Sequence, residues 1–247
     1  MIRSIILTIV LVFPFSIALS AQINDDRTFA AGTTVYIHSN NGLVVREKPS
    51  RNGKRLASIG FGQSATVIAP PDKRQTLEVA GIKGFWVNVK HGAGTGYVFS
   101  GFISKFPVAK NRFFPVYHKK LQSLKLPSTY TNKPVNTPGK PQPENENTET
   151  LVLKGATMAD AYLIARSLFE VPKSIKWPKK LTKKTTSINN PKKSEGVHES
   201  TLTLSAGPQG TLNKINYFSQ YDGGSEDFRV SAVDSETIKF EFAASVD

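Results

Sequence analysis

Between Thr33 and Phe106 the apolar residues fall in short alternating runs, and turn signals separate these runs about every 8 to 12 residues. Alternation with a period of two places successive side chains on opposite faces of a strand, so each run has one face to bury. The runs contain Val35 and Ile37, Leu43 and Val45, Leu56 and Ile59, Ala65 and Val67, Leu77 and Val79, Trp86 and Val89, and Tyr97. This pattern predicts a small all-β barrel or sandwich over residues 31–107.

Three segments of this region resemble the bacterial SH3 (SH3b) domain. They are the first hairpin, Gly42-Leu43-Val44-Val45-Arg46-Glu47-Lys48-Pro49-Ser50, a glycine-tryptophan strand at Gly84 to Val89, and a closing strand with a short helical turn at Gly96 to Ile103. Val44 and Lys48 stand where the family usually has asparagine and glycine. The resemblance covers less than a third of the chain. It implies an SH3-like β-barrel that binds a cell-wall ligand.

Aromatic and basic residues of the expected barrel form the candidate ligand site. Tyrosine and tryptophan favour binding surfaces, because they combine a broad apolar contact with a polar group. Adjacent strand residues face opposite ways, so Phe85 and Trp86 cannot both point inward, and one of them is expected to be exposed or covered by a loop. The expected ligand-binding residues are Tyr36, Arg46, Lys48, Arg55, Trp86, Tyr97 and Phe99.

The first 20 residues have the pattern of a signal peptide. Arg3 precedes an apolar run from Ile5 to Phe15, and the small residues Ala18 and Ser20 predict cleavage after Ser20. The alternative is a membrane anchor, but the run is shorter than the roughly 20 apolar residues that span a bilayer. We therefore expect an exported chain, periplasmic or secreted, without a transmembrane segment after cleavage.

The formal net charge of +13 is unevenly distributed. Residues 31–107 hold ten lysines and arginines against three acids, and Lys173 to Lys193 holds eight lysines and no acid. Residues 199–247, in contrast, hold eight acids against three basic residues. Such charge can steer an anionic partner, or it can serve solubility and attraction between the two halves of the chain. The lysine-rich segment is either functional or a solvated loop, and the sequence leaves this open.

The rest of the chain is expected to hold a basic extension at 108–126 that packs on the barrel, a proline-rich linker at 127–150, and a second domain at 151–247. In that domain Thr157 and Asp160 resemble a capping box, and the apolar residues that follow recur at helical spacing until Pro172. Four alternating runs between Leu202 and Phe242 then predict an antiparallel meander. The expected fold class is mainly β: an SH3-like barrel, then a small α+β domain of one helix on four strands.

No motif indicates catalysis or a cofactor. The chain has no cysteine, which excludes the thiol nucleophile of the wall peptidases that often accompany SH3b domains. The four histidines lack metal-ligand spacing and are each expected on the surface or in a turn, and Gly92 to Gly96 is expected to be a hairpin turn. We therefore expect no enzyme, no cofactor and no metal.

The sequence predicts a module that binds a cell-wall peptide or another anionic wall component. The alternative is a periplasmic protein that docks on an envelope protein and has no wall ligand. A nucleic-acid partner is not expected of an exported chain, and nothing in the sequence indicates an oligomeric state.

Overall fold

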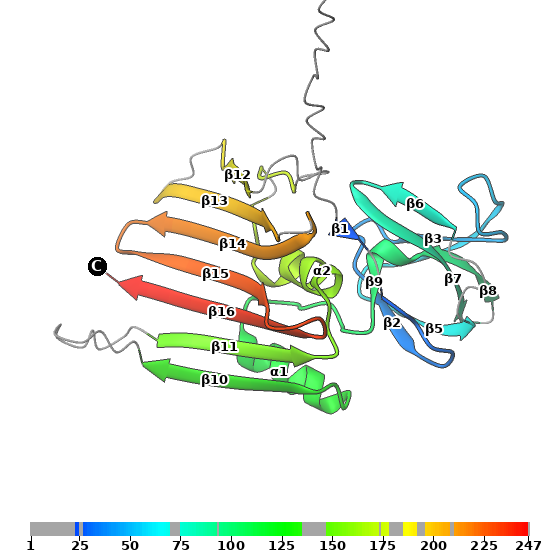
Figure 1. Cartoon of the computed structure of the whole chain (residues 1–247), viewed down its shortest axis with the longest axis horizontal. Helices are drawn as coiled ribbons and strands as arrows, with labels where there is room; N and C mark the ends of the chain where they lie inside the picture. Colours follow the sequence, from blue (N-terminus) through cyan, green and yellow to red (C-terminus); the bar gives the residue numbers. More distant parts are fainter. Residues whose placement is uncertain are drawn as a thin grey trace, which may run out of the picture.

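The computed structural model describes residues 23–24, 27–69, 75–92, 94–134, 147–172, 174–177, 185–191, 196–207 and 210–246. Within them the chain is mainly β, as predicted, with two sheets and two α-helices (Figure 1). The expected signal peptide, residues 1–20, lies outside the described residues. None of the helices described is long and apolar enough to cross a membrane.

The first sheet contains nine strands in the described part of the chain and follows the path β4-β3-β8-β7-β5-β2-β9. Its strands are β1 (Ile23–Asn24), β2 (Thr34–Ile37), β3 (Leu43–Arg46), β4 (Arg55–Ile59), β5 (Ser64–Ala69), β6 (Thr76–Val79), β7 (Ile82–His91), β8 (Gly94–Phe99) and β9 (Ile103–Ser104). Both β1 and β6 pair with β7 beside this path. The described strands show no pairing between β4 and β9, so the sheet stays open and the predicted closed barrel is not seen in this part of the chain.

Each predicted apolar run of the first half lies in one of these strands. The burial pattern of β3 alternates, with Leu43 and Val45 inside, because the strand presents successive side chains to opposite faces. Gly96 lets β8 approach β3 closely, since an added Cβ would lie 2.6 Å from Cγ1 of Val45. After β8, a 3₁₀ turn (Ser100–Phe102) leads into β9.

The second sheet has seven strands among the described residues, in the order β10-β11-β16-β15-β14-β13-β12. Its strands are β10 (Ser128–Pro134), β11 (Asn147–Lys154), β12 (Thr185–Asn189), β13 (Val197–Ala206), β14 (Leu212–Tyr221), β15 (Gly224–Ala232) and β16 (Thr237–Val246). The predicted four-stranded meander is confirmed as β13 to β16, each strand antiparallel to the next.

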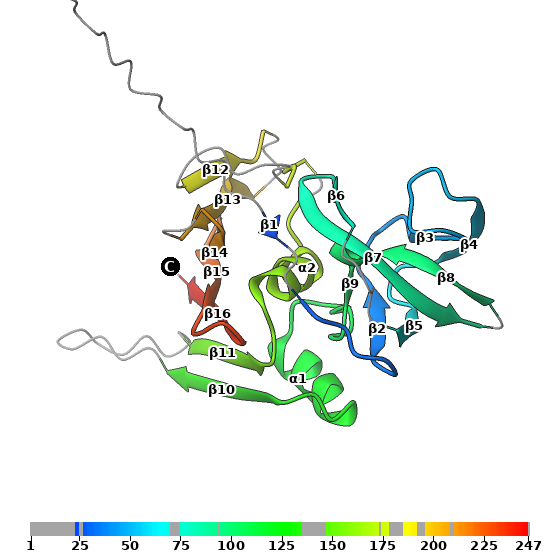
Figure 2. The same ribbon diagram turned by 45° about the vertical axis from the view of Figure 1, so that its right-hand side comes forward.

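Helix α2 (Met158–Leu168) is the predicted helix and covers the second sheet. Its capping box is complete: Thr157 accepts from the backbone N–H of Asp160, and Asp160 accepts from that of Thr157. Ile164 and Leu168 are buried with Phe228 and Phe240 of the sheet, because helical spacing gives α2 one continuous apolar face. Figure 2 shows α2 between the two sheets.

The expected basic extension contains a second helix, α1 (Phe114–Ser123), and it packs on the second sheet rather than on the first. Phe114, Tyr117 and Leu121 recur at three- and four-residue spacing and are buried in the core of the second half. The Phe114 ring lies 6.5 Å from that of Phe242 in β16. The prediction that this segment packs on the first half of the chain was wrong.

The linker prediction for 127–150 was also wrong where the structure describes that segment. Residues 128–134 form β10 and residues 147–150 begin β11, and the two strands pair from Ser128↔Leu153 to Pro134↔Asn147. Polar β-formers such as Thr129 and Thr131 build an edge strand that needs few apolar residues. Residues 135–146 lie outside the described part of the chain.

Part of the lysine-rich segment 173–193 is ordered too. Ile175 is buried, Trp177 makes an edge-on contact with Tyr162 at 5.0 Å between centroids, and residues 185–189 form the edge strand β12. Of the two alternatives that the sequence left open, a solvated loop does not describe these residues. The remaining lysines of this segment, apart from Lys176, lie outside the described residues.

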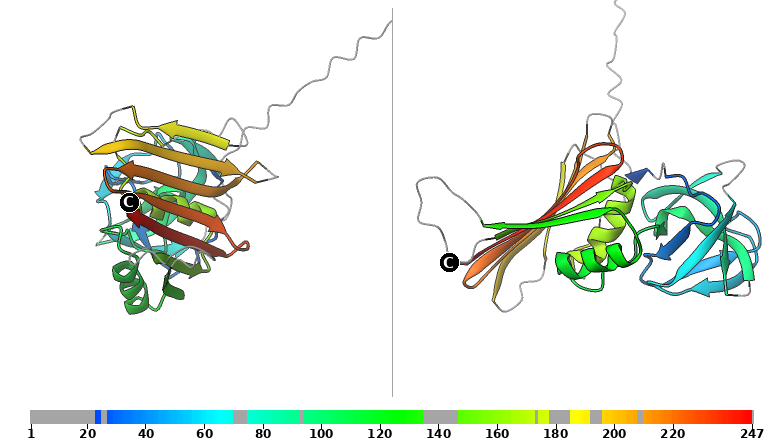
Figure 3. Two further views of the ribbon diagram at one scale, coloured as in Figure 1. Left: turned by 90° about the vertical axis from the view of Figure 1, so that its left-hand side faces the viewer. Right: turned by 90° about the horizontal axis from the view of Figure 1, so that it is seen from below.

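Both helices lie on the side of the second sheet that faces the first sheet (Figure 3). Two hydrophobic cores result, one inside the first sheet and one between the second sheet and its helices. Ile82 and Phe106, from the first half of the chain, belong to the second of these cores. The two halves therefore meet across a packed junction.

Candidate binding site

A groove of about 510 Å³ opens on the first sheet, between β3, the end of β8 and the β6–β7 hairpin. Its residues are Ser39, Gly42, Leu43, Val44, Arg46, Arg51, Leu77, Glu78, Val79, Ala80, Trp86, Phe99 and Phe102. The walls are mostly apolar and the charged groups are few, which is the usual composition of a ligand site. Three of the seven predicted residues, Arg46, Trp86 and Phe99, line it.

The strand register brings two of these residues side by side. Trp86 in β7 pairs with Phe99 in β8, and cross-strand partners point to the same face of a sheet. Trp86 is 8% exposed and Phe99 is 4% exposed, so both form the groove wall rather than a shelf on the surface. Phe102 extends this wall, with its ring edge-on to that of Phe99 at 5.5 Å.

Arg46 and Arg51 contribute the positive charge of the groove. Arg46 lies at the end of β3, and its Nη1 donates to the carbonyl oxygen of Gly53 at 2.8 Å. Arg51 lies in the turn after β3 and donates to the carbonyl oxygen of Glu78 in β6. These hydrogen bonds hold both guanidinium groups beside the apolar wall, so an anionic ligand would meet cations that are already positioned.

The other four predicted residues do not line the groove. Tyr97 pairs with Arg46 and shares its face of the sheet, half-buried at the edge of the first core. Tyr36 is half-buried in β2, between β5 and β9. Lys48 and Arg55 are exposed on the β3–β4 hairpin. Their positive charge lies on the same hairpin as Arg46 and Arg51.

Phe85 and Trp86 face opposite sides of β7, as the strand pattern requires, and both are buried. The segment before β2 covers Phe85, whose ring centroid lies 6.3 Å from that of Phe29. Of the two possibilities that the sequence left open for the outer aromatic residue, exposure or cover by a loop, the structure shows cover by a loop. Trp86 is then the aromatic residue that reaches the groove.

Sequence reasoning missed the contribution of the β6–β7 hairpin. Leu77, Glu78 and Val79 belong to β6, which forms a two-residue turn at Ala80 and Gly81, both with positive φ. The alternation of Leu77 and Val79 predicted the strand, but a strand pattern does not reveal which other strand lies opposite. Arg51 was missed as well, because nothing in the sequence except its charge indicates a ligand-binding role.

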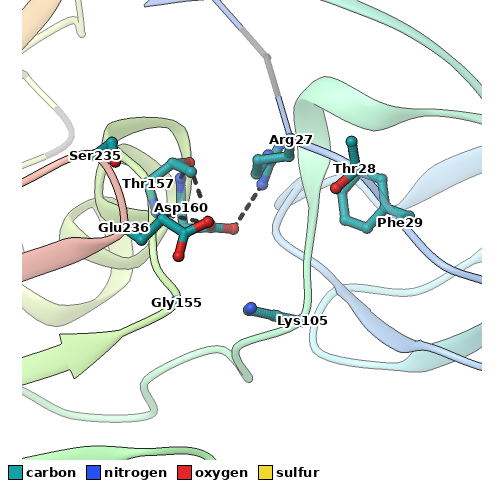
Figure 4. Close-up of a pocket in the computed structure, with 9 residues that line it drawn as sticks. All are labelled: Arg27, Thr28, Phe29, Lys105, Gly155, Thr157, Asp160, Ser235 and Glu236. Atoms are coloured by element: carbon teal, nitrogen blue, oxygen red, sulfur yellow. Dashed lines mark hydrogen bonds and ion pairs between the residues drawn. The ribbon is translucent and has the colours of Figure 1, made fainter.

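A second pocket, of about 350 Å³, lies at the junction between the halves and contains a buried ion pair (Figure 4). Nη1 of Arg27 donates to Oδ1 of Asp160 at 2.8 Å and to the carbonyl oxygen of Ile103 at 2.7 Å. Ser104 donates to the same Oδ1 at 2.6 Å, and the backbone of Thr157 donates to Oδ2 at 3.1 Å. Both carboxylate oxygens thus accept protein hydrogen bonds, and the group joins the two halves.

Burial and the ion pair act in opposite directions on Asp160. Desolvation favours the neutral acid, but the charge of Arg27 and the hydrogen bonds from Ser104, Arg27 and Thr157 together outweigh it. The pKa of Asp160 is therefore lowered, and the carboxylate stays charged inside the protein. Lys105 and Glu236 line the same pocket.

His38 is buried at this junction, 3% exposed, where the sequence predicted a surface or turn residue. Its Nε2 lies 3.0 Å from the carbonyl oxygen of Phe106 and its Nδ1 lies 3.3 Å from that of Leu163 in α2. Burial lowers its pKa to about 4, although both carbonyl contacts and nearby Asp160 oppose that change. The residue contacts both halves of the molecule, which its sequence position could not indicate.

Among the described residues no three His, Cys, Asp or Glu side chains gather as metal ligands. Comparison with known proteins adds no relative: no family model, no curated protein and no solved structure matches this chain.

Proposed function

We propose that the chain is a non-catalytic binding protein of the cell envelope, whose first half is an SH3-type module that holds a cell-wall peptide or another anionic wall component. The observation that carries this proposal is the groove in which Arg46, Trp86 and Phe99 meet. These three residues are separated in the chain, and the sequence predicts each of them as ligand-binding.

The groove suits a peptide that has both apolar and carboxylate groups. Leu43, Leu77 and Trp86 would bury the aliphatic parts of such a peptide, because removing apolar surface from water is favourable. Arg46 and Arg51 would bind a carboxylate, since a guanidinium offers a planar fork of donors. Glu78 would accept a hydrogen bond from an ammonium group of the ligand.

Sedimentation with isolated cell-wall sacculi tests the proposal. The double variant Arg46→Gln and Arg51→Gln should weaken binding about 100-fold or more, because each of the two lost charge-assisted hydrogen bonds contributes about 1.5 to 3 kcal/mol. Lys83→Gln with Lys90→Gln is the matched control: it removes the same charge from exposed positions of β7 outside the groove. If both double variants lost the same amount of binding to sacculi, the binding would depend on net charge alone, and the proposal would be contradicted.

Fluorescence provides a second readout. Trp86 and Trp177 are the two tryptophans, so the variant Trp177→Phe leaves only the tryptophan of the groove. Titration with soluble wall peptides should change the emission of this variant, and Arg46→Gln should move the change to higher peptide concentration. Unchanged emission, together with capture of the chain by an envelope protein instead of sacculi, would favour the protein-docking alternative.

A further inference from the structure

Helix α1 exposes two large apolar side chains on the face opposite the core. Phe113, at its N-cap, is 59% exposed and Val116, in its first turn, is 53% exposed. Single exposed apolar residues are ordinary on protein surfaces. Here the two stand together at the start of one helix, Phe113 as its N-cap and Val116 in its first turn.

Lysines continue this surface. Lys119 and Lys120 follow Val116 by three and four residues, so they lie one helical turn along the same side, and both are exposed. We name Phe113, Val116, Lys119 and Lys120 the α1 outer face. Lys110 before it and Lys125 after it are also exposed.

The charge around the α1 outer face is positive. The sequence from Val79 to Pro143 contains no aspartate or glutamate. Glu226, from β15, reaches this region, but Nη1 of Arg112 neutralises it at 2.6 Å. The lysines of α1 therefore have no acidic residue on their own helix or on the segments that flank it.

The position of α1 makes this surface convex. The helix forms the lower margin of the molecule in Figure 1 and projects below the second sheet in the left view of Figure 3. A projecting helix cannot enclose a small ligand. It can rest on a flat partner that offers hydrocarbon and negative charge at different depths.

We infer that the α1 outer face docks on an anionic phospholipid bilayer. Phe113 and Val116 enter the boundary between head groups and acyl chains, and Lys119 and Lys120 lie at the level of the lipid phosphates. Helices that lie on membranes combine these same two features, apolar side chains on one side and lysines beside them. The charge is complementary, and a bilayer surface adapts to a convex helix without a matching groove.

Co-sedimentation with lipid vesicles tests the inference, with the chain that begins at Ala21 so that the apolar run Ile5 to Phe15 does not itself bind lipid. Vesicles of phosphatidylglycerol and phosphatidylcholine in equal parts should bind it, and vesicles of phosphatidylcholine alone should bind it far less. Lys119→Gln with Lys120→Gln should weaken binding to the mixed vesicles about 30-fold, the factor that corresponds to two lysines near an anionic surface.

A second variant, with its own control, tests the contribution of Phe113 and Val116 to vesicle binding. Phe113→Ser with Val116→Ser should lower binding at every salt concentration, whereas Val233→Ser, which changes an equally exposed residue of the β15–β16 connection, should not. Lys83→Gln with Lys90→Gln controls for charge. Thermal unfolding of each variant verifies that the fold is intact, and all four substitutions of the α1 outer face lie at exposed positions.

The inference is overturned if phosphatidylcholine alone binds as well as the mixture, or if the α1 variants bind like the controls. It is also overturned if these variants lose binding to sacculi rather than to vesicles, since the surface would then belong to a wall ligand. Arg46→Gln with Arg51→Gln should keep full vesicle binding, which separates this inference from the function proposed for the groove.

Discussion

Arg27, in the segment before the first sheet's strand β2, donates a 2.8 Å hydrogen bond to Asp160 of helix α2, 133 residues further along the chain. Both side chains are almost fully buried. The same guanidinium donates to the carbonyl oxygens of Ser100 in the 3₁₀ turn and Ile103 in β9. It therefore links these two parts of the first half to helix α2. The two halves are thus joined by a buried charge pair as well as by apolar packing.

Removing one member of this pair should destabilise the protein strongly. Asp160→Asn leaves the Arg27 guanidinium buried without its counter-charge, and such losses cost about 3 to 5 kcal/mol. The double variant Arg27→Met with Asp160→Leu should recover most of this loss, because an apolar pair needs no counter-charge. Urea unfolding measures both. A single variant as stable as the wild type would show that solvent reaches the pair.

Acidification should weaken the protein through His38. Its pKa falls from 6.5 in the unfolded chain to about 4 in the folded one, mainly through burial. Between these values the unfolded chain binds a proton that the folded chain does not, so the free energy of unfolding decreases as pH falls from 6.5 toward 4. The charged groups that act on His38 are Asp160, which raises its pKa, and Arg27, which lowers it.

The measurement is the free energy of unfolding against pH for the wild type and for His38→Gln, which has no proton to gain. The wild type should lose up to about 3 kcal/mol more than the variant across this window. Asp160 adds its own loss only below pH 3.8, because its pKa is lowered in the folded state. Parallel curves for the two proteins down to pH 4 would contradict the assignment to His38.

Gly84 should be required for the shape of the groove. A Cβ there would lie 2.8 Å from Cε2 of Phe99, so Gly84→Ala must displace the ring that forms the groove wall. The expected cost is about 1 to 3 kcal/mol of stability, the range for overpacked sites, together with weaker binding to sacculi. Gly94→Ala is the control, since its Cβ would meet nothing nearer than 3.9 Å. If both variants bound sacculi equally well, Phe99 would not belong to the binding site.

Limited proteolysis should nick the chain between Pro134 and Asn147 without separating the pieces. The composition of that segment favours cleavage, but β10 pairs with β11 across it, and α1 lies in the same core as α2. The fragments should elute together from a size-exclusion column and part only in denaturant. Two independently folded products, one ending near Leu126 and one beginning near Leu151, would restore the linker interpretation.

The parts of the fold that the sequence predicted are those with a local signal. Strands β2, β3 and β5 of the first sheet and the β13 to β16 meander alternate clearly, and α2 has a cap, an apolar stripe and the stop at Pro172. Helix α1 was not predicted although Phe114, Tyr117 and Leu121 have helical spacing, because only these three of its ten residues are buried and the apolar stripe is narrow. Strands β10 and β12 were missed because edge strands of threonine and serine bury little apolar surface.

The candidate site was predictable only in part, for a different reason. Arg46, Trp86 and Phe99 are of residue types that favour binding, and strands β3, β7 and β8 bring them to one groove. Leu77 and Glu78 of the β6–β7 hairpin and Arg51 of the turn after β3 complete that groove, and their positions depend on contacts across the sheet. The Arg27 to Asp160 pair and the two carbonyl contacts of His38 depend on the packing of the whole chain, which no local pattern encodes.

The long sequence separation at the junction also sets an order of events during synthesis. Arg27 and His38 leave the ribosome well before Asp160 and Leu163, their partners in α2. Until α2 forms, an arginine and a histidine destined for the interior remain in water, and the first sheet lacks the surface that later covers it. A chain truncated before α2 would therefore leave Arg27 and His38 exposed to water, so this junction forms only after synthesis has passed Leu168.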